Sequence, residues 1–180
     1  MTVAVDCFSK YPEEACLSSK NSEAVIMAMK DMFACHGIPE RLIADNMPFN
    51  GLKFKDFASK WEFEVVTSSP HHPKSNGLVE RNIQTVKQLL RKAYESKQDA
   101  FFALLEFRNS PISGMDESPA ELPMSRKLRK RLPTSKSLLQ PQPRSTSQIH
   151  HNLLTRQQCQ KVLYDRGTQP LSKLHEGEPV

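Results

Sequence analysis

The first 125 residues alternate short apolar runs with longer stretches in which apolar residues recur every three or four positions. The short runs have the length and composition of β-strands, and they cover residues 2–8, 13–17, 41–44 and 63–67. The periodic stretches are typical of amphipathic helices, and they cover residues 21–36, 51–61, 76–93 and 100–107. The pattern therefore predicts a pair of strands followed by helices and strands in alternation.

Local signals indicate where several elements begin and end. The turn at residues 9–12 joins the first two strands into a hairpin. Asn21 or Ser22 is expected to cap the first helix, which Gly37 closes and Pro39 prevents from continuing.

Two shorter segments follow the long helix of residues 76–93. The helix at residues 100–107 is expected to pack through Phe101, Leu104, Leu105 and Phe107. Ser118 and Pro119 have the residue types of an N-cap and a first helical position, so a small helix is expected to start there.

The long helix has two distinct faces. Ser75 is the candidate N-cap, and the expected core positions are Val79, Ile83, Val86, Leu90 and Ala93. A second face carries Glu80, Gln84, Lys87 and Arg91 at the same helical spacing. One acid is thereby placed at the start of a helix, with amide and basic groups beside it.

A second acid, Asp45, follows the apolar run 41–44, as expected of a residue at the rim of a sheet. Carboxylates at a strand end and on a helix can converge, and oxygen ligands suit Mg²⁺ or Mn²⁺. On spacing alone a structural interpretation is favoured, in which Asp45 ends a strand and Glu80 is a solvated first-turn acid stabilised by the helix dipole.

Several motifs favour the metal-binding interpretation of Asp45 and Glu80 instead. Residues 68–81 read Ser-Ser-Pro-His-His-Pro-Lys-Ser-Asn-Gly-Leu-Val-Glu-Arg, and this segment resembles the one around the catalytic glutamate of gypsy-type retrotransposon integrases. Other matching pieces occur in the same order: residues 3–11, 36–39, 45–46, 108–111 and 118–122. The resemblance covers nearly the whole chain and identifies it with retroviral-like integrase catalytic cores.

The resemblance implies an α/β, ribonuclease-H-like core, a mixed sheet flanked by helices, which integrates DNA by metal-dependent phosphodiester strand transfer. Asp45 and Glu80 match the second and third acids of an Asp, Asp, Glu triad that holds Mg²⁺ or Mn²⁺. DNA is the implied partner, and self-association is implied by the family. The candidate DNA-contacting residues are Lys74, Asn76, Gln84, Lys87 and Arg91.

The sequence departs from the family pattern in three places. The strand with the first triad acid would lie before Met1, so the sheet is expected to lack its first, central strand; Asp6 matches a second-strand aspartate that is structural. Asp45 and Glu80 are separated by 34 residues, one fewer than usual, and Met47 stands where the family has glycine. Lys74 replaces the usual glutamine. Either the hairpin closes the gap against the strand ending at Asp45, or an edge stays open.

Composition permits nucleic-acid binding without requiring it, because 25 Lys and Arg stand against 20 Asp and Glu, for a net charge of +5. The four cysteines lack the spacing of a zinc site and are interpreted as reduced thiols. Without a signal-peptide or membrane-spanning pattern, the protein is expected to be nuclear or cytoplasmic, not secreted and not membrane-bound.

The expected organisation is an integrase-core-like domain at residues 1–125, a basic and Pro-rich linker at 126–148, and a polar helix with the start of a truncated C-terminal barrel at 149–180. The basic cluster at residues 126–131 is either a solvated linker or a phosphate-contacting patch.

The expected function is that of a retroelement integrase core with impaired catalysis, because two of three acids hold two metals poorly. The competing interpretation is a non-catalytic module, from a decayed or co-opted retrotransposon, that binds nucleic acid or a protein partner. A reading frame that starts too late and gives no functional product is the third.

The missing strand predicts marginal stability. Unsatisfied buried backbone groups cost about 1–3 kcal/mol each, which rivals the roughly 5–15 kcal/mol stability of a whole domain. We expect thermal unfolding, followed by circular dichroism, to have its midpoint below about 50 °C. A cooperative transition above that temperature would contradict the expectation.

Overall fold

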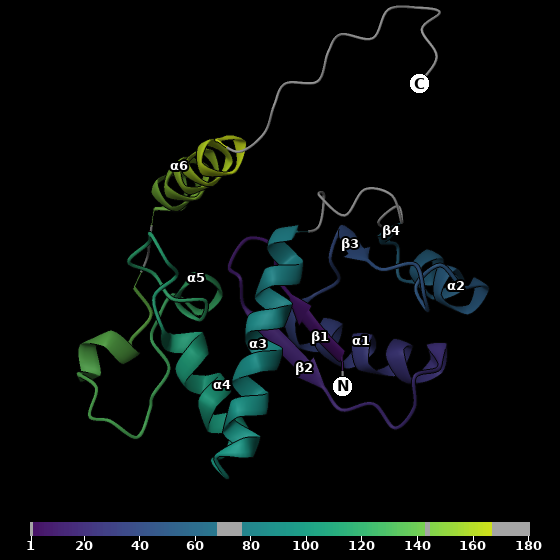
Figure 1. Ribbon diagram of the computed structural model, residues 1–180, viewed down its shortest axis with the longest axis horizontal. Helices are drawn as coiled ribbons and strands as arrows, with labels where there is room; N and C mark the ends of the chain where they lie inside the picture. Colours follow the sequence, from purple (N-terminus) through teal and green to yellow (C-terminus); the bar gives the residue numbers. More distant parts are fainter. Residues whose placement is uncertain (1, 68–76, 143–144, 167–180) are drawn as a thin grey trace, which may run out of the picture.

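The computed structural model describes residues 2–67, 77–142 and 145–166. Its elements, in chain order, are β1 (Thr2–Val5), β2 (Pro12–Ala15), α1 (Ser22–His36), β3 (Arg41–Ala44), α2 (Leu52–Lys60), β4 (Glu64–Thr67), α3 (Gly77–Glu95), α4 (Ala100–Asn109), α5 (Glu121–Met124), the 3₁₀ helix η2 (Lys136–Leu139) and α6 (Thr146–Asp165). The order of strands and helices predicted from the sequence is confirmed (Figure 1).

The strands form two separate pairs. β1 and β2 are antiparallel, with Val3 opposite Glu14, whereas β3 and β4 are parallel, with Leu42 opposite Val65. The predicted hairpin is therefore present, but β1 does not pair with β3. The sequence left two alternatives, a hairpin that closes against the strand ending at Asp45 or an edge that stays open. The structure has the open edge.

The first strand ends sooner than the hydrophobic run, at Val5, because the next residue starts the turn. The Asp6 carboxylate accepts hydrogen bonds from the Ser9 backbone N–H at 2.7 Å and from its hydroxyl at 2.6 Å. The Asp6 N–H donates to the carbonyl of Tyr11 at 3.0 Å. Asp6 thus stabilises the hairpin turn, as its structural interpretation predicted.

The first helix is bounded as the sequence predicts. The Asn21 side chain accepts a hydrogen bond from the Ala24 N–H at 2.9 Å. At the other end Gly37, with φ of 91°, donates its N–H to the carbonyl of Phe33.

Helices cover the two strand pairs from opposite sides. On one side α1 and α2 form the larger core, whose buried members are Val25, Met29, Met32, Phe54, Phe57, Ala58 and Phe63. On the other side Val86 and Leu90 of α3 pack with Leu104 of α4, and Val3 of β1 reaches the same cluster. Ala4, the next residue along β1, packs instead on the α1 side. The α/β fold class expected from the sequence is confirmed.

Two local expectations about the later helices are wrong. Phe101 is 73% exposed, because the buried stripe of α4 runs through Ala100, Leu104 and Phe107. The small helix starts at Glu121 with Ala120 as its N-cap rather than Ser118. Ser118 and Glu121 still exchange hydrogen bonds, since the Ser118 N–H donates to the Glu121 carboxylate at 3.0 Å.

The Arg108-Asn109 pair holds neighbouring segments together. Arg108 donates to the carbonyl of Pro12 at 2.8 Å and 3.1 Å, and its guanidinium lies 4.6 Å from the centroid of the Tyr11 ring. The buried Asn109 side chain accepts from the Leu128 N–H at 2.9 Å and donates to the Leu128 carbonyl at 3.0 Å. These residues connect α4 to the hairpin and to the segment that follows α5.

Phe54 offers the sharpest test of the larger core. It is fully buried and its ring contacts those of Phe49, Phe57 and Phe63, with centroids 4.9, 5.5 and 6.4 Å away. We expect Phe54→Ala to lower the free energy of unfolding by about 3–5 kcal/mol. The matched control is Leu52→Ala on the same helix, where an 87% exposed side chain should change stability by less than about 0.5 kcal/mol. Equal effects of both changes in urea unfolding would show that α2 is not packed as described.

Candidate nucleic-acid and metal site

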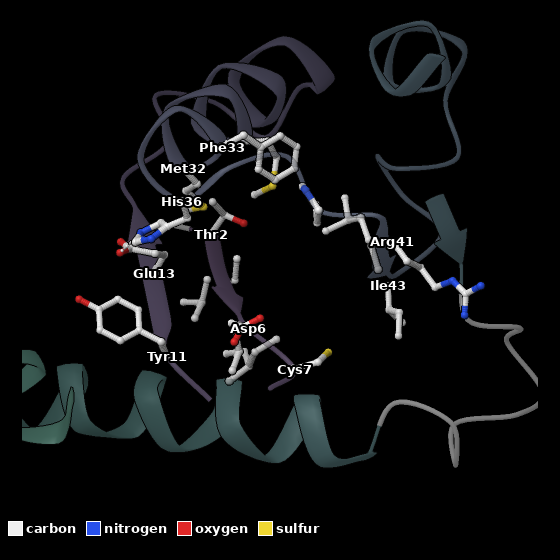
Figure 2. Close-up of a pocket in the computed structure, with 18 of the residues that line it drawn as sticks. Thr2, Asp6, Cys7, Tyr11, Glu13, Met32, Phe33, His36, Arg41 and Ile43 are labelled. Carbon is white, nitrogen blue, oxygen red and sulfur yellow. Dashed lines mark hydrogen bonds and ion pairs between the residues drawn. The ribbon is translucent and has the colours of Figure 1, made fainter. Parts of the chain in front are cut away.

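A cavity of about 810 Å³ lies between the two strand pairs. β1 and β3 face each other across it, with Thr2 on one strand and Arg41 and Ile43 on the other (Figure 2). Met32 and Phe33 of α1 lie along one side, and α3 runs along the opposite side. The described lining thus comes mainly from β1, α1, β3 and α3, and it includes Glu13 of β2 and Pro123 of α5.

Asp45 and Glu80 both line this cavity. Asp45 follows directly on Ala44, whose side chain is buried, so the strand delivers its carboxylate to the rim. Glu80 is in the first turn of α3, which is held in its rotation by the buried Val86 and Leu90. Asp45 is exposed and Glu80 is half-buried. In the part of the chain that the structure describes, neither forms an ion pair.

Only some of the other candidate site residues line the cavity. Gln84 and Lys87 line the cavity one and two turns after Glu80. Arg91 does not line it, and its guanidinium lies 3.6 Å from the carboxylate of Glu95. Lys74 and Asn76, together with the candidate N-cap Ser75 and the expected barrel start at residues 174–180, lie outside the described residues.

Among the described residues, four acids line the cavity, Asp6, Glu13, Asp45 and Glu80, and Glu13 is paired with His36 and Arg108. Asp45 and Glu80 supply the hard oxygen atoms that Mg²⁺ and Mn²⁺ prefer. Asp6 also lines the cavity, but its carboxylate is bound to Ser9. Within residues 2–67, 77–142 and 145–166, no three His, Cys, Asp or Glu side chains come together as a metal-binding group. The described residues therefore form no complete metal site, and Asp45 and Glu80 could supply two ligands of one.

Met47 has replaced the glycine of the family pattern without straining the backbone. It is 77% exposed and is not among the described residues with positive φ, which are Lys10, Gly37, Glu62, Lys97, Gly114 and Ser125. The conformational freedom of glycine is not needed at this position.

A second, smaller pocket of about 220 Å³ was not anticipated from the sequence. Its described lining contains three cationic side chains, Lys10 of the hairpin turn, Arg81 of α3 and Arg156 of α6, and no acidic residue. Burial lowers the pKa of Lys10 most strongly, Cys7 and Asp6 oppose that shift, and the charge of Arg156 adds to it. Burial also lowers the pKa of Arg156. Such a pocket favours an anion.

Only Arg81 had a signal in the sequence, as the neighbour of Glu80 in the matched motif. Lys10, Arg81 and Arg156 are far apart along the chain and meet because Ile149 and Leu153 of α6 pack on Ile112 and Met115. No residue spacing could have joined them.

Part of the basic cluster at residues 126–131 is bound to α4. Lys130 forms an ion pair with Glu106 at 2.7 Å, and the Arg131 guanidinium lies 5.7 Å from the centroid of the Phe102 ring. Two of the five cations in the cluster therefore contact other groups of the protein.

Comparison with known sequences shows which proteins this chain is similar to and whether the similarity includes the two acids. The family model described as the TnsB C-terminal domain matches residues 12–95, a range that contains both Asp45 and Glu80. The Caenorhabditis elegans protein K02A2.6 is 32% identical over 147 residues, which cover 78% of this chain and 11% of that protein. The Transposon Tf2-3 polyprotein of Schizosaccharomyces pombe is 39% identical over 92 residues, which cover 49% of this chain and 7% of the polyprotein. The chain thus spans about a tenth of these relatives.

Solved structures agree on the fold. A simian T-cell lymphotropic virus intasome in complex with PP2A regulatory subunit B56 gamma aligns with a TM-score of 0.61 and 23% identity, over 80% of this chain and 52% of that one. The HTLV-2 integrase catalytic core domain in complex with magnesium aligns with a TM-score of 0.54 and 21% identity, over 68% of this chain and 82% of that one. This chain is a homologue of retroelement polyproteins with an integrase-core fold.

The matched motifs differ in the contacts that their side chains make. Asp6, Arg108 and Asn109 fall in matched segments and make structural hydrogen bonds, whereas Asp45 and Glu80 make none that the described residues reveal. No helix in the described ranges is both long and apolar enough to cross a membrane.

Proposed function

We propose that this integrase-like core binds DNA at the rim of the large cavity and holds Mg²⁺ or Mn²⁺ there through Asp45 and Glu80. The observation that carries the proposal is that these two acids, from a strand end and a helix start, line one cavity together with Gln84 and Lys87. The magnesium complex of the HTLV-2 core, which shares the fold, supports the choice of ion.

Each residue has a distinct task in this proposal. Asp45 and Glu80 provide the anionic oxygen ligands, and a bound ion would polarise the phosphodiester and stabilise the charge that develops on its oxygens. Lys87 offers its ammonium group to a DNA phosphate, and Gln84 offers an amide donor from the same face of α3. Lys74, Asn76 and Arg91 stay candidate DNA contacts on the sequence alone.

The reaction class is phosphodiester strand transfer, as in DNA integration, with turnover impaired in this chain. An in-line displacement by paired ions needs more carboxylate than one aspartate and one glutamate provide. Outer hydrogen bonds tune metal ligands but do not replace one. The chain is therefore proposed to retain the DNA and metal binding of an integrase more fully than its strand-transfer activity.

A non-catalytic nucleic-acid-binding module is the second candidate, and the smaller pocket favours it. Lys10, Arg81 and Arg156 converge without an acidic residue in the described lining and apart from Asp45. DNA binding through this pocket would persist when the metal ligands are removed.

Metal binding tests the first candidate. Asp45→Asn and Glu80→Gln should each weaken Mn²⁺ binding at least about tenfold, because each removes one of two charged ligands. Titration calorimetry with Mn²⁺ measures this directly, and Asp56→Asn, at an exposed acid paired with Lys60, is the matched control. Unchanged affinity in both variants would remove the proposed site.

A DNA-nicking assay tests the proposed impairment separately. We expect no turnover with Mg²⁺ beyond background. Joining or nicking of DNA ends that stops on Glu80→Gln would show that the chain is an active enzyme.

Salt dependence tests the smaller pocket. Arg81→Gln and Arg156→Gln should weaken binding of duplex DNA equally for all sequences and reduce the slope of log K against log salt by about 1 each, because each removes one phosphate contact. Fluorescence anisotropy at several salt concentrations gives the slope. Lys92→Gln on α3 and Lys161→Gln on α6 are the matched controls, since both side chains are exposed and outside the pocket. A slope that falls as much in the controls would mean that the pocket has no special role.

A further inference from the structure

The smaller pocket gathers cations without a counter-charge. Lys10 of the hairpin turn, Arg81 of α3 and Arg156 of α6 line this space of about 220 Å³, and its described lining contains no acid. Within residues 2–67, 77–142 and 145–166, none of the three forms an ion pair. Lys10 and Arg156 are half-buried, and burial lowers the pKa of both. Positive charges held together in a partly dry space repel one another unless an anion joins them.

The rest of the lining suits a phosphate group. Neutral hydrogen-bond donors complete the described polar lining: Asn82, Ser113, Gln157 and Gln160. A phosphate carries about 1.5 to 2 negative charges near neutral pH and several strong acceptor oxygens. The pocket has the volume of about seven water molecules in the liquid. It therefore has room for a phosphate with a few waters, but not for a whole nucleotide.

The pocket lies where α6 has little apolar contact with the core. The first half of the helix packs on the core through Ile149 and Leu153. Beyond that point the side chains of Leu154, Val162 and Leu163 are 44%, 58% and 63% exposed. The polar side chains that α6 contributes to the pocket belong to this second half. The pocket is thus the place where the second half of α6 meets the core.

We propose that the smaller pocket binds one phosphate group, and that the bound phosphate fastens the second half of α6 to the core. Arg156 holds the phosphate from α6, while Lys10 and Arg81 hold it from the core, so that one anion bridges three elements. Without the anion, repulsion among the three cations opposes docking of the helix. With it, the same cations form charge-assisted hydrogen bonds to a shared partner.

Two sources can supply this chemistry, free inorganic phosphate and a phosphate of the DNA backbone. The proposal uses the same anion site as the second candidate function, but it does not depend on DNA as the source. It adds a structural consequence, because the position of α6 becomes dependent on the anion.

Hydrogen exchange of the α6 amides reports whether the helix is docked. Isolated helices shorter than about 12–15 residues are marginal in water, and the second half of α6, residues 154–165, is no longer than that. These amides therefore exchange readily once this half leaves the core.

The test follows hydrogen exchange in residues 154–163 of the full chain by nuclear magnetic resonance. In inorganic phosphate at about ten times Kd, exchange should be about tenfold slower than in sodium chloride, because exchange then requires release of the phosphate. The two solutions have the same pH and ionic strength, so that binding is separated from the screening that chloride also provides.

Variants of the pocket show whether its cations carry the effect. Arg81→Gln and Arg156→Gln should each lose the response to phosphate. Both should also exchange more slowly than the unaltered chain in chloride, because one of the repelling charges is gone. Lys92→Gln and Lys161→Gln, on the same two helices, should keep the response, since both side chains are exposed and outside the pocket. Arg81→Gln leaves α6 itself unaltered, so the test holds even where Arg156→Gln weakens the helix.

A DNA duplex with 5′-hydroxyl ends, added in place of inorganic phosphate, distinguishes the sources. Slower exchange with both ligands supports a site open to free and backbone phosphate, and slower exchange with inorganic phosphate alone supports a site for the free ion. An effect of the duplex alone would place the contact outside the pocket and overturn the proposal.

Three further results would overturn it: equal exchange in phosphate and chloride, a phosphate response that both arginine variants keep or both lysine variants lose, or faster exchange of both arginine variants in chloride. This test measures docking of α6 by inorganic phosphate and involves neither metal nor DNA affinity. Its failure is therefore distinguishable from failure of the proposed function.

Discussion

A strand that pairs on one side leaves half of its backbone hydrogen-bonding groups to find partners elsewhere, and this constraint acts twice in the molecule. Among the described residues β1 pairs with β2 alone and β3 with β4 alone, so each strand has one unpaired edge beside the shared cavity. In a dry interior each unpaired group costs about 1–3 kcal/mol. The groups at these two edges therefore need hydrogen-bond partners other than each other, because the cavity lies between the two strand pairs.

The separation determines how the proposed site is assembled. Asp45 follows β3 and belongs to the half built on α1 and α2, whereas Glu80 belongs to α3, which packs with β1 and α4. The halves are connected through the β2 side of the hairpin, where Glu13 pairs with both His36 of α1 and Arg108 of α4 at 2.8 Å and 3.2 Å. Glu13 thus adds a polar link between the two layers beside β1, whose Val3 and Ala4 pack on opposite cores.

Local chemistry made much of this fold predictable. Asn21 and Gly37 bound α1 because an amide cap and a positive φ act within a few residues. Asp45 and Glu80 were recognised from matched motifs, and their shared cavity could be expected from a strand end facing a helix start. The meeting of Lys10, Arg81 and Arg156 could not, because it depends on how α6 packs on Ile112 and Met115. Phe101 was misjudged for a similar reason, since its exposure depends on which stripe of α4 meets α3.

The cavity and the two acids are linked through the elements that carry them. Asp45 follows β3 and Glu80 belongs to α3, and both acids line the same cavity. A divalent ion that took an oxygen from each acid would have to hold β3 and α3 at the distance its coordination needs. The free energy used for that ordering would lower the apparent affinity of the ion. The metal affinity of this chain would therefore depend on the packing of β3 and α3 as much as on the two carboxylates.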